Sequence, residues 1–503
     1  YAGEFLYFIL SIFLLSVMAY FLGSSVELDS FLIAFIIPQF FILSLQGIVR
    51  GGIIPKFIEL KDDYDEYTSW RYFWQNIFIL ILASVAVMII LVILGPLFFG
   101  IISMGLKGGS TKEIIKMFSF LMLGTIFANV NTLISEVYFA EDDFKKPAIG
   151  KLIHIIILIV FITGYSDEIG VYSVVFGYLA GYIFETLYLL APIRDKFIYA
   201  AEMHQFYKSN AVISTLKNSI PLILTAVFLF VDILVDRFIA GFGKYGGTIS
   251  SLNYAFSLSF GISTIFLLPT MWIFYPRIIQ AAKNADTPKL RNSLIRAVNA
   301  VLFFMIPLAA IILFARNEFV SVFFFRGSFD ELSYNLTRNA LLGYGFNLPF
   351  FAVNSILILA FYSSGKVKPL ISPLVSSVIT NFFLDIVLFS IFGIFGIAFA
   401  TALVQCSLMF NLTKLMYKEV GINIRGKDIT DLTKIIFATV IMAVASIILF
   451  IATEKIIGDS LQDKTLRLFF IIFESTAIYF FASKLLKIEA PDSLFAEIKP
   501  GIK

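Results

Sequence analysis

Residues 74–99 read WQNIFILILASVAVMIILVILGPLFF, and this run contains no Asp, Glu, Lys or Arg. An α-helix needs about 20 mostly apolar residues to cross the hydrocarbon of a bilayer. A run of this length crosses it with some tilt or with its ends outside the hydrocarbon. The stretch therefore predicts a transmembrane helix, and similar stretches follow on both sides of it.

The composition of the whole chain agrees with this local pattern. Of 503 residues, 59% are hydrophobic and 15% are charged, whereas an ordinary soluble domain carries about 25% charged residues. No soluble interior of this size hides so much apolar surface from water. A net charge of +3 gives no indication of nucleic-acid binding, and one Cys and two His leave little for a disulfide framework or a metal site built from them. The composition predicts a polytopic membrane protein.

Fourteen apolar stretches are long enough to be membrane spans. They cover roughly residues 4–22, 30–49, 74–99, 114–140, 148–165, 171–193, 211–240, 248–274, 295–315, 339–362, 369–391, 394–416, 432–453 and 466–486. The first stretch lacks the basic start and the small-residue cleavage site of a signal peptide, so we count it as a span. The predicted fold class is an all-α polytopic membrane protein with 14 transmembrane helices.

Lys and Arg residues in the loops predict the orientation, because cytoplasmic loops carry an excess of them. Loops on the side of the N-terminus contain basic residues such as Lys145, Arg277 and Arg425, whereas the loops around Glu27 and Gly393 contain none. With an even number of spans, both termini are predicted to be cytoplasmic.

The two halves of the chain share landmarks at matched spacing. Tyr138-Phe139-Ala140, Lys146-Pro147 and Gly170-Val171-Tyr172 correspond to Ala360-Phe361-Tyr362, Lys368-Pro369 and Gly393-Ile394-Phe395. Lys-Pro and Gly are common at the start of any span, but agreement of three landmarks favours an internal repeat. We predict two parallel six-helix repeats, an N-lobe (residues 1–200) and a C-lobe (201–420) around a central cavity. Residues 421–503 then hold the last two spans and a cytoplasmic tail.

Four stretches together form a recognisable pattern. They are Leu22-Gly23 with Asp29 to Pro38, Val235-Asp236 with Gly247 to Ala255, Phe325-Arg326-Gly327 with Gly343 to Pro349, and Phe361-Tyr362 with Pro369 and Gly396 to Thr401. Each is weak alone, but together they resemble the MviN/MurJ branch of the multidrug/oligosaccharidyl-lipid/polysaccharide exporter superfamily. The type member of this branch is the lipid II flippase, and the resemblance extends over nearly the whole repeat region.

The resemblance implies a flippase that moves a polyprenyl-diphosphate-linked saccharide, lipid II in peptidoglycan synthesis, to the outer leaflet of the bacterial cytoplasmic (inner) membrane by alternating access. The sequence contains no P-loop or other enzyme signature, so we expect a transporter driven by Na⁺, H⁺ or the membrane potential. The expected partners are undecaprenyl-diphosphate-linked saccharides and membrane lipids, with cell-wall synthesis proteins as further candidates. We expect a monomer without a covalent cofactor.

Other functions stay open at this point. Where the family usually carries cavity arginines, this chain has Phe8, Leu14-Leu15 and Phe256-Ser257. Lipid II stays the leading cargo, and this departure makes the repeat units of O-antigen or capsular polysaccharide the main alternative. A cation-coupled drug exporter of the same superfamily normally has twelve spans, and a non-transporting scaffold or polymerase partner does not need charged residues inside its spans.

Polar residues within the second span are candidate substrate contacts, because polar groups inside a membrane are costly and often functional. Gln39 and Gln46 share one helix face, and Arg50 extends that face by one turn. Arg50 is the first candidate for a phosphate contact, although a cytoplasmic anchor is an equally good interpretation. Asp29 matches the family, but an N-cap of its own span is the simpler interpretation.

The seventh and eighth spans supply further candidates for substrate binding. Arg237 follows Asp232 and Asp236 on the seventh span and could pair with them, contact substrate or extend to the outer interface. Asn253 lies in the stretch of the eighth span that resembles the family.

Asn381 and Asp385 are four residues apart and therefore point to one face of the eleventh span. The family resemblance adds Asp236 and Thr401, and Ile397, one turn before Thr401, offers a backbone carbonyl. Oxygen ligands without His or Cys suit a hard cation, so these five residues form a candidate Na⁺ site, with H⁺ on the carboxylates as the alternative. A buried hydrogen-bonded cluster that joins helices would use the same residues.

Four further intramembrane groups receive a structural interpretation. Glu136, Glu185 and Glu474 are interpreted as interhelical or interfacial groups, and His154 as a residue of the packed core.

Overall fold

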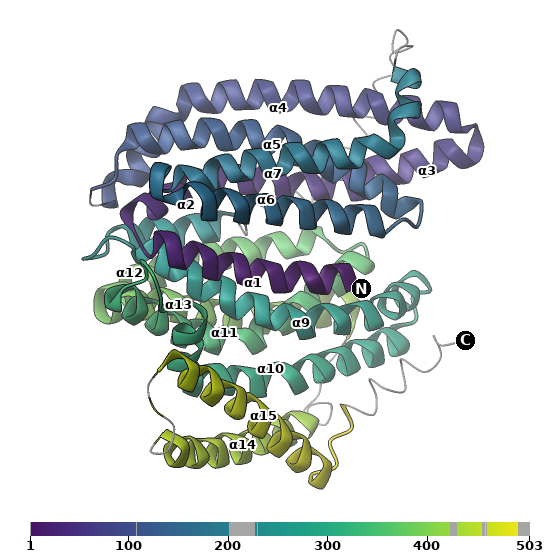
Figure 1. The fold of residues 1–503 in the computed structure, drawn as a ribbon. Helices are drawn as coiled ribbons and strands as arrows, with labels where there is room; N and C mark the ends of the chain where they lie inside the picture. Colours follow the sequence, from purple (N-terminus) through teal and green to yellow (C-terminus); the bar gives the residue numbers. More distant parts are fainter. Residues whose placement is uncertain are drawn as a thin grey trace. The chain divides into compact units, whose positions relative to one another are not determined.

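The computed structural model describes residues 2–106, 108–200, 227–228, 230–422, 430–454, 458 and 460–490. Regular secondary structure in these residues is helical throughout (Figure 1). The long helices are α1 Ala2–Leu22, α2 Val26–Ile48, α4 Glu66–Ile102, α5 Thr111–Ala140, α6 Lys145–Ile169, α7 Tyr172–Leu190, α9 Thr248–Lys283, α10 Thr287–Phe323, α11 Glu331–Ser363, α12 Ile371–Phe392, α13 Ile394–Val420, α14 Thr430–Glu454 and α15 Leu461–Leu485. Shorter segments are the π-helix Val49–Ile53, α3 Ile54–Asp63 and the 3₁₀ segments Ser103–Gly105, Ala191–Ala200 and Lys368–Leu370. The predicted all-α fold class is confirmed for the described residues.

Twelve helical stretches of the described residues are long and apolar enough to cross a membrane. The first helix, α1, is apolar over the shorter stretch Leu6–Leu22. The predicted span 211–240 lies largely outside the described residues, which include its helical end at 230–241. The count of fourteen spans therefore stays a prediction.

Large apolar side chains cover the outside of several helices. Only 6% of the most apolar part of α4 is buried, and Ile93 and Leu97 are 70% and 72% exposed. Phe469 and Phe473 on α15 are exposed to a similar degree. Apolar surface of this extent is unfavourable in water and favourable in a lipid bilayer, where helices satisfy their own backbone groups.

The chain divides into two compact units, Tyr1–Ser250 and Ser251–Lys503, called here the N-terminal and C-terminal units. In the N-terminal unit, α5 packs against α2, α4 and α7, while α6 packs against α1 and α7. In the C-terminal unit, α11 packs against α10 and α13, and α12 against α13. The predicted lobes 1–200 and 201–420 stay a prediction.

The last two helices are attached to the C-terminal unit through α10. Both α14 and α15 pack against it, and the Tyr479 hydroxyl on α15 donates to the Phe303 carbonyl at 2.8 Å. Arg467 and Glu318 form a buried ion pair with a 3.8 Å separation. Removing one member of such a pair leaves an uncompensated buried charge, so the pair fixes how α15 docks on α10.

Two glycines predicted as repeat landmarks adopt nearly the same backbone conformation. Gly170, between α6 and α7, has φ 55° and ψ −133°, and Gly393, between α12 and α13, has φ 61° and ψ −142°. This region is accessible essentially only to glycine, since a Cβ would clash with the backbone. This shared conformation explains why glycine occurs at both positions. It agrees with the predicted repeat at these two turns.

Polar caps extend several helices beyond the predicted spans. α4 begins at Glu66 because the Asp65 carboxylate accepts from the Thr68 amide, and Asp286 caps α10 through the Lys289 amide in the same way. The charged residues around Lys61, which lie between the predicted spans 30–49 and 74–99, belong to helix α3. The length of an apolar run predicts the part of a helix that lies inside the hydrocarbon. It does not predict the polar ends of these helices.

Candidate functional site

Asp29 lies on the first turns of α2 and is almost fully buried. Its Oδ2 accepts from the Gly247 amide at 2.8 Å, and its Oδ1 accepts from the Ser250 amide at 2.6 Å. These amides precede and begin α9, where no intrahelical acceptor is available. The expectation that Asp29 caps its own helix is wrong, because the Ser25 side chain occupies that position and accepts from Leu28 N–H.

Arg237, on the helical segment 230–241, is also buried within the N-terminal unit. Its guanidinium donates to the Leu32 carbonyl on α2 at 2.7 Å. The side chain therefore contacts α2 instead of extending to the outer interface. Asp29 and Leu32 are one turn apart, so both contacts join the same part of α2 to residues 237–250.

The candidate residues Gln39 and Gln46 lie half-buried on α2. Arg50 follows them in the π-helix Val49–Ile53, a form of helix frequent at functional sites. Its Nε donates to Glu136 Oε1 on α5 at 2.7 Å, while 61% of the Arg50 side chain stays exposed. Glu136 is thus an interhelical group, as interpreted, and Arg50 reaches both α5 and solvent.

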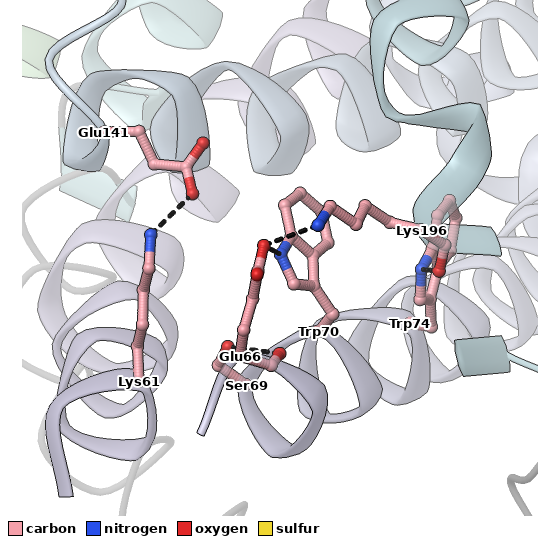
Figure 2. Close-up of polar contacts among 7 residues, drawn as sticks. All are labelled: Lys61, Glu66, Ser69, Trp70, Trp74, Glu141 and Lys196. Carbon is pink, nitrogen blue, oxygen red and sulfur yellow. Dashed lines mark hydrogen bonds and ion pairs between the residues drawn. The ribbon is translucent and has the colours of Figure 1, made fainter. Parts of the chain in front are cut away.

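A second set of polar contacts, not predicted from the sequence, joins α3 and α4 to distant parts of the N-terminal unit. Figure 2 shows Lys61 of α3 paired with Glu141 after α5, at 2.9 Å. Glu66 accepts from Lys196 at 2.6 Å and from the Trp70 indole at 3.3 Å. Trp70, which donates to Glu66, also belongs to a buried aromatic core that includes Phe73. The polar contacts of α4 therefore lie directly beside this core.

Four of the five candidate cation ligands lie in the C-terminal unit. Asn381 and Asp385 of α12 are fully buried, and the Asn381 amide donates to Asp385 Oδ2 at 3.3 Å. On the adjacent α13, the Thr401 hydroxyl donates to the Ile397 carbonyl at 3.2 Å. The predicted shared faces are therefore observed on each helix. Asp236 belongs to the N-terminal unit, and the described residues contain no group of three or more His, Cys, Asp or Glu able to hold a metal.

Asn253 lies half-buried on α9, one turn before Phe256. Phe256 stacks on Phe260 with a centroid distance of 5.5 Å and meets Tyr344 edge-on at 5.4 Å. Phe260 in turn meets Phe351 at 5.4 Å. The position where the family usually has a charged pair is thus part of an aromatic cluster in the C-terminal unit.

Long apolar helices with exposed faces, together with buried Asp, Asn, Arg and Glu among them, define a polytopic membrane transporter. The family model described as "Lipid II flippase MurJ" matches residues 18–461, and the chain belongs to this family. The resemblance found in the four sequence stretches is confirmed.

Relatives and solved structures agree with this assignment. A probable lipid II flippase MurJ from Buchnera aphidicola subsp. Schizaphis graminum (strain Sg) is 25% identical over 493 residues, covering 94% of this chain and 92% of the relative. The structure of lipid II flippase MurJ in an inward closed conformation aligns with a TM-score of 0.78 at 20% identity, over 96% of this chain and 97% of that chain. An inward-facing multidrug resistance MATE family transporter of the MOP superfamily aligns at 0.70 with 13% identity, over 82% and 94%. These two structures show a common fold.

Proposed function

We propose that this protein translocates lipid II, a polyprenyl-diphosphate-linked saccharide, from the cytoplasmic to the outer leaflet of the bacterial inner membrane by alternating access. The observation that carries the proposal is the family match over residues 18–461. In this proposal both termini lie in the cytoplasm, and the undecaprenyl tail stays in the bilayer while the head group passes through the protein.

The physical task is to carry a diphosphate past hydrocarbon. Even one charged side chain at the bilayer centre costs about 3 kcal/mol or more, so the head group needs a polar path with cationic or amide donors. Arg50 suits the start of such a path, since its guanidinium offers five donors and most of the side chain is exposed. We propose that a phosphate of the substrate competes with Glu136 for Arg50, and that Glu136 keeps Arg50 paired when no substrate is bound.

Asp29 and Arg237 supply the element that has to rearrange. Both hold α2 to residues 237–250 through contacts with main-chain groups. We propose that these contacts form in one access state and break in another. Because a helix N-terminus can be hydrated when it opens to water, breaking the Asp29 contacts is reversible.

For the driving force we propose Na⁺ bound by Asn381, Asp385, Thr401 and Ile397 of the C-terminal unit, with H⁺ on the Asp385 carboxylate as the alternative. The support is the burial of a carboxylate and an amide on one face of α12. In addition, the Thr401 hydroxyl donates its proton to the Ile397 carbonyl, so its oxygen keeps its lone pairs as acceptors. Asp385→Ala should abolish any Na⁺ dependence of lipid II binding measured on purified protein. An unchanged Na⁺ dependence contradicts the site.

A second cargo is favoured by the aromatic cluster around Phe256. Apolar faces replace charge at a position where the family usually has it, which suits a head group with fewer charges than lipid II. The alternative function is therefore a flippase for O-antigen or capsular repeat units on the same polyprenyl carrier.

Complementation of bacteria depleted of their lipid II flippase separates the two cargoes. Rescue by this chain supports lipid II, whereas failure at normal membrane expression shifts the cargo to another glycolipid. Proteoliposomes then test transport directly, with and without a Na⁺ gradient. Failure to move any polyprenyl-diphosphate saccharide refutes the flippase function altogether.

A further inference from the structure

Helices α6 and α7 approach closely through two glycines arranged reciprocally. On α6, Gly150 lies one turn before His154, and on α7, Gly181 lies one turn before Glu185. A Cβ at position 181 would lie 2.9 Å from His154 Nδ1, and a Cβ at position 150 would lie 3.3 Å from Glu185 Cγ. Each glycine therefore makes room for the titratable side chain of the other helix.

This packing brings His154 and Glu185 together inside the N-terminal unit. His154 Nδ1 lies 3.9 Å from Glu185 Oε2, and the two side chains are 11% and 8% exposed. Within the described residues His154 Nδ1 has no hydrogen-bond partner. The separation is that of an ion pair if the imidazole is protonated, and it is longer than a hydrogen bond.

Tyrosine rings of α7 and polar groups of α5 surround the His154–Glu185 pair. On α7, the rings of Tyr182 and Tyr178 lie 4.1 Å and 5.4 Å from the His154 ring. On α5, Asn131 accepts from the Thr186 hydroxyl at 2.6 Å and donates to the Tyr182 carbonyl.

The charged or titratable groups that face the pair come from three helices. They are Tyr178 and Tyr182 of α7, Lys151 of α6, which acts electrostatically on Glu185, and Tyr7 of α1, whose ring lies 5.6 Å from Lys151 Nζ. Lys151 is the cation nearest to His154 in the sequence. It lies one turn before His154, on the side of the N-terminus of α6.

Burial restricts the protonation states that such a pair can adopt. A lone ionised group in an apolar interior is strongly disfavoured, so the pair is most stable with one shared proton, either as imidazolium and carboxylate or as neutral imidazole and carboxylic acid. Loss of that proton to water leaves one buried negative charge. Proton release is therefore coupled to whether the α6–α7 contact is open to water.

We propose that His154 and Glu185 form a proton-binding site in the N-terminal unit, built by the reciprocal glycine contacts of α6 and α7. The ligand is a single proton, exchanged with water when the contact opens. The site is separate from the candidate cation ligands of the C-terminal unit, and its existence does not depend on which lipid is transported.

The test is a pH titration of the purified full chain in liposomes without substrate, followed by infrared difference spectroscopy of protonated carboxyl groups. Glu185→Gln should remove one titrating carboxyl signal. His154→Gln should leave a Glu185 signal but change the pH range over which it titrates, because the imidazole no longer shares the proton with the carboxyl group. Glu474→Gln on α15 is the matched control and should leave the His154-dependent signal unchanged.

Gly181→Ala is a second test that removes no titratable group. It should displace His154 from α7 and change the same signal in the direction of His154→Gln, which protects the test against a poorly folded Glu185→Gln. If the carboxyl signal titrates identically in wild type, His154→Gln and Gly181→Ala, the two groups do not share a proton and the proposal is overturned. This outcome leaves the lipid II assays unaffected, so the two proposals fail independently.

Discussion

Replacing Asp29 by Ala removes the acceptor of two main-chain amides at the start of α9. Gly247 and Ser250 donate to Asp29 at 2.8 Å and 2.6 Å, and the carboxylate is buried. A buried donor left without an acceptor costs about 1–3 kcal/mol, so losing both contacts should favour local opening by at least about 2 kcal/mol. Because about 1.4 kcal/mol is a factor of ten, the opening equilibrium should rise about 30-fold.

Hydrogen–deuterium exchange of peptides covering residues 245–252 measures this change at constant pH. In Asp29→Ala, exchange at the Gly247 and Ser250 amides should accelerate about 30-fold, since local opening governs their protection. Ser25→Ala is the matched control, because it removes a capping acceptor at the start of α2 and leaves α9 untouched. Unchanged protection of residues 245–252 in Asp29→Ala refutes the assignment of Asp29 as the cap of α9.

Three further outcomes follow from the described contacts. Arg50→Lys keeps a cation beside the buried Glu136 but loses the planar guanidinium donors, so it should change stability by less than about 1 kcal/mol and yet slow lipid II transport in proteoliposomes; an equal loss of transport in Lys61→Arg contradicts a specific role for Arg50. Hydrogen bonds from the Ser333 side chain and amide lower the pKa of Asp330, so its cap on α11 stabilises at neutral pH and is lost as pH falls through that lowered pKa. The difference of about 1 kcal/mol between wild type and Asp330→Ala should therefore disappear in acid denaturation curves. Gly393→Ala should destabilise the fold by about 1–3 kcal/mol through backbone strain alone, whereas Gly164→Ala, in a regular helix with open space around it, should not.

Much of the fold was predictable because the bilayer imposes one strong constraint. Apolar runs of about 20 residues have few solutions other than a transmembrane helix, and the ranges predicted around residues 114–140 and 394–416 coincide with α5 and α13. The ends were less predictable. Segment 49–63 is helical because a π-turn continues α2 into α3, and its charged residues carry no hydrophobic signal.

The site was predictable only where two candidates share one helix. The i,i+4 relation placed Asn381 beside Asp385, and the structure shows that contact. Contacts with main-chain groups carry no such signal, so neither Arg237 with the Leu32 carbonyl nor Asp29 with the amides of α9 was found. Spacing within a helix identifies which side chains share a face, but not what that face meets.

His154 and Glu185 show what additional signal a sequence can hold. Taken singly, His154 was interpreted as a residue of the packed core and Glu185 as an interhelical or interfacial group. The pattern Gly-x-x-x-His on one helix followed by Gly-x-x-x-Glu on the next is more informative, because two glycines permit close approach and both titratable groups then fall at the contact. The pair emerges only when the two consecutive helices are considered together.

Main-chain partners also explain how this chain buries charge with so few charged residues. The Asp29 carboxylate lies at the N-terminus of α9, where the helix dipole and the main-chain amides stabilise its negative charge, and the Arg237 guanidinium donates to the Leu32 carbonyl. Breaking such a contact exposes main-chain groups that water can satisfy, whereas separating two buried ions leaves both uncompensated. Contacts between a charged side chain and main-chain groups therefore suit a transporter whose helices have to separate and rejoin. The Glu318–Arg467 pair joins two buried ions instead, and it lies where α15 is attached to α10, a contact that the proposed alternating access leaves intact.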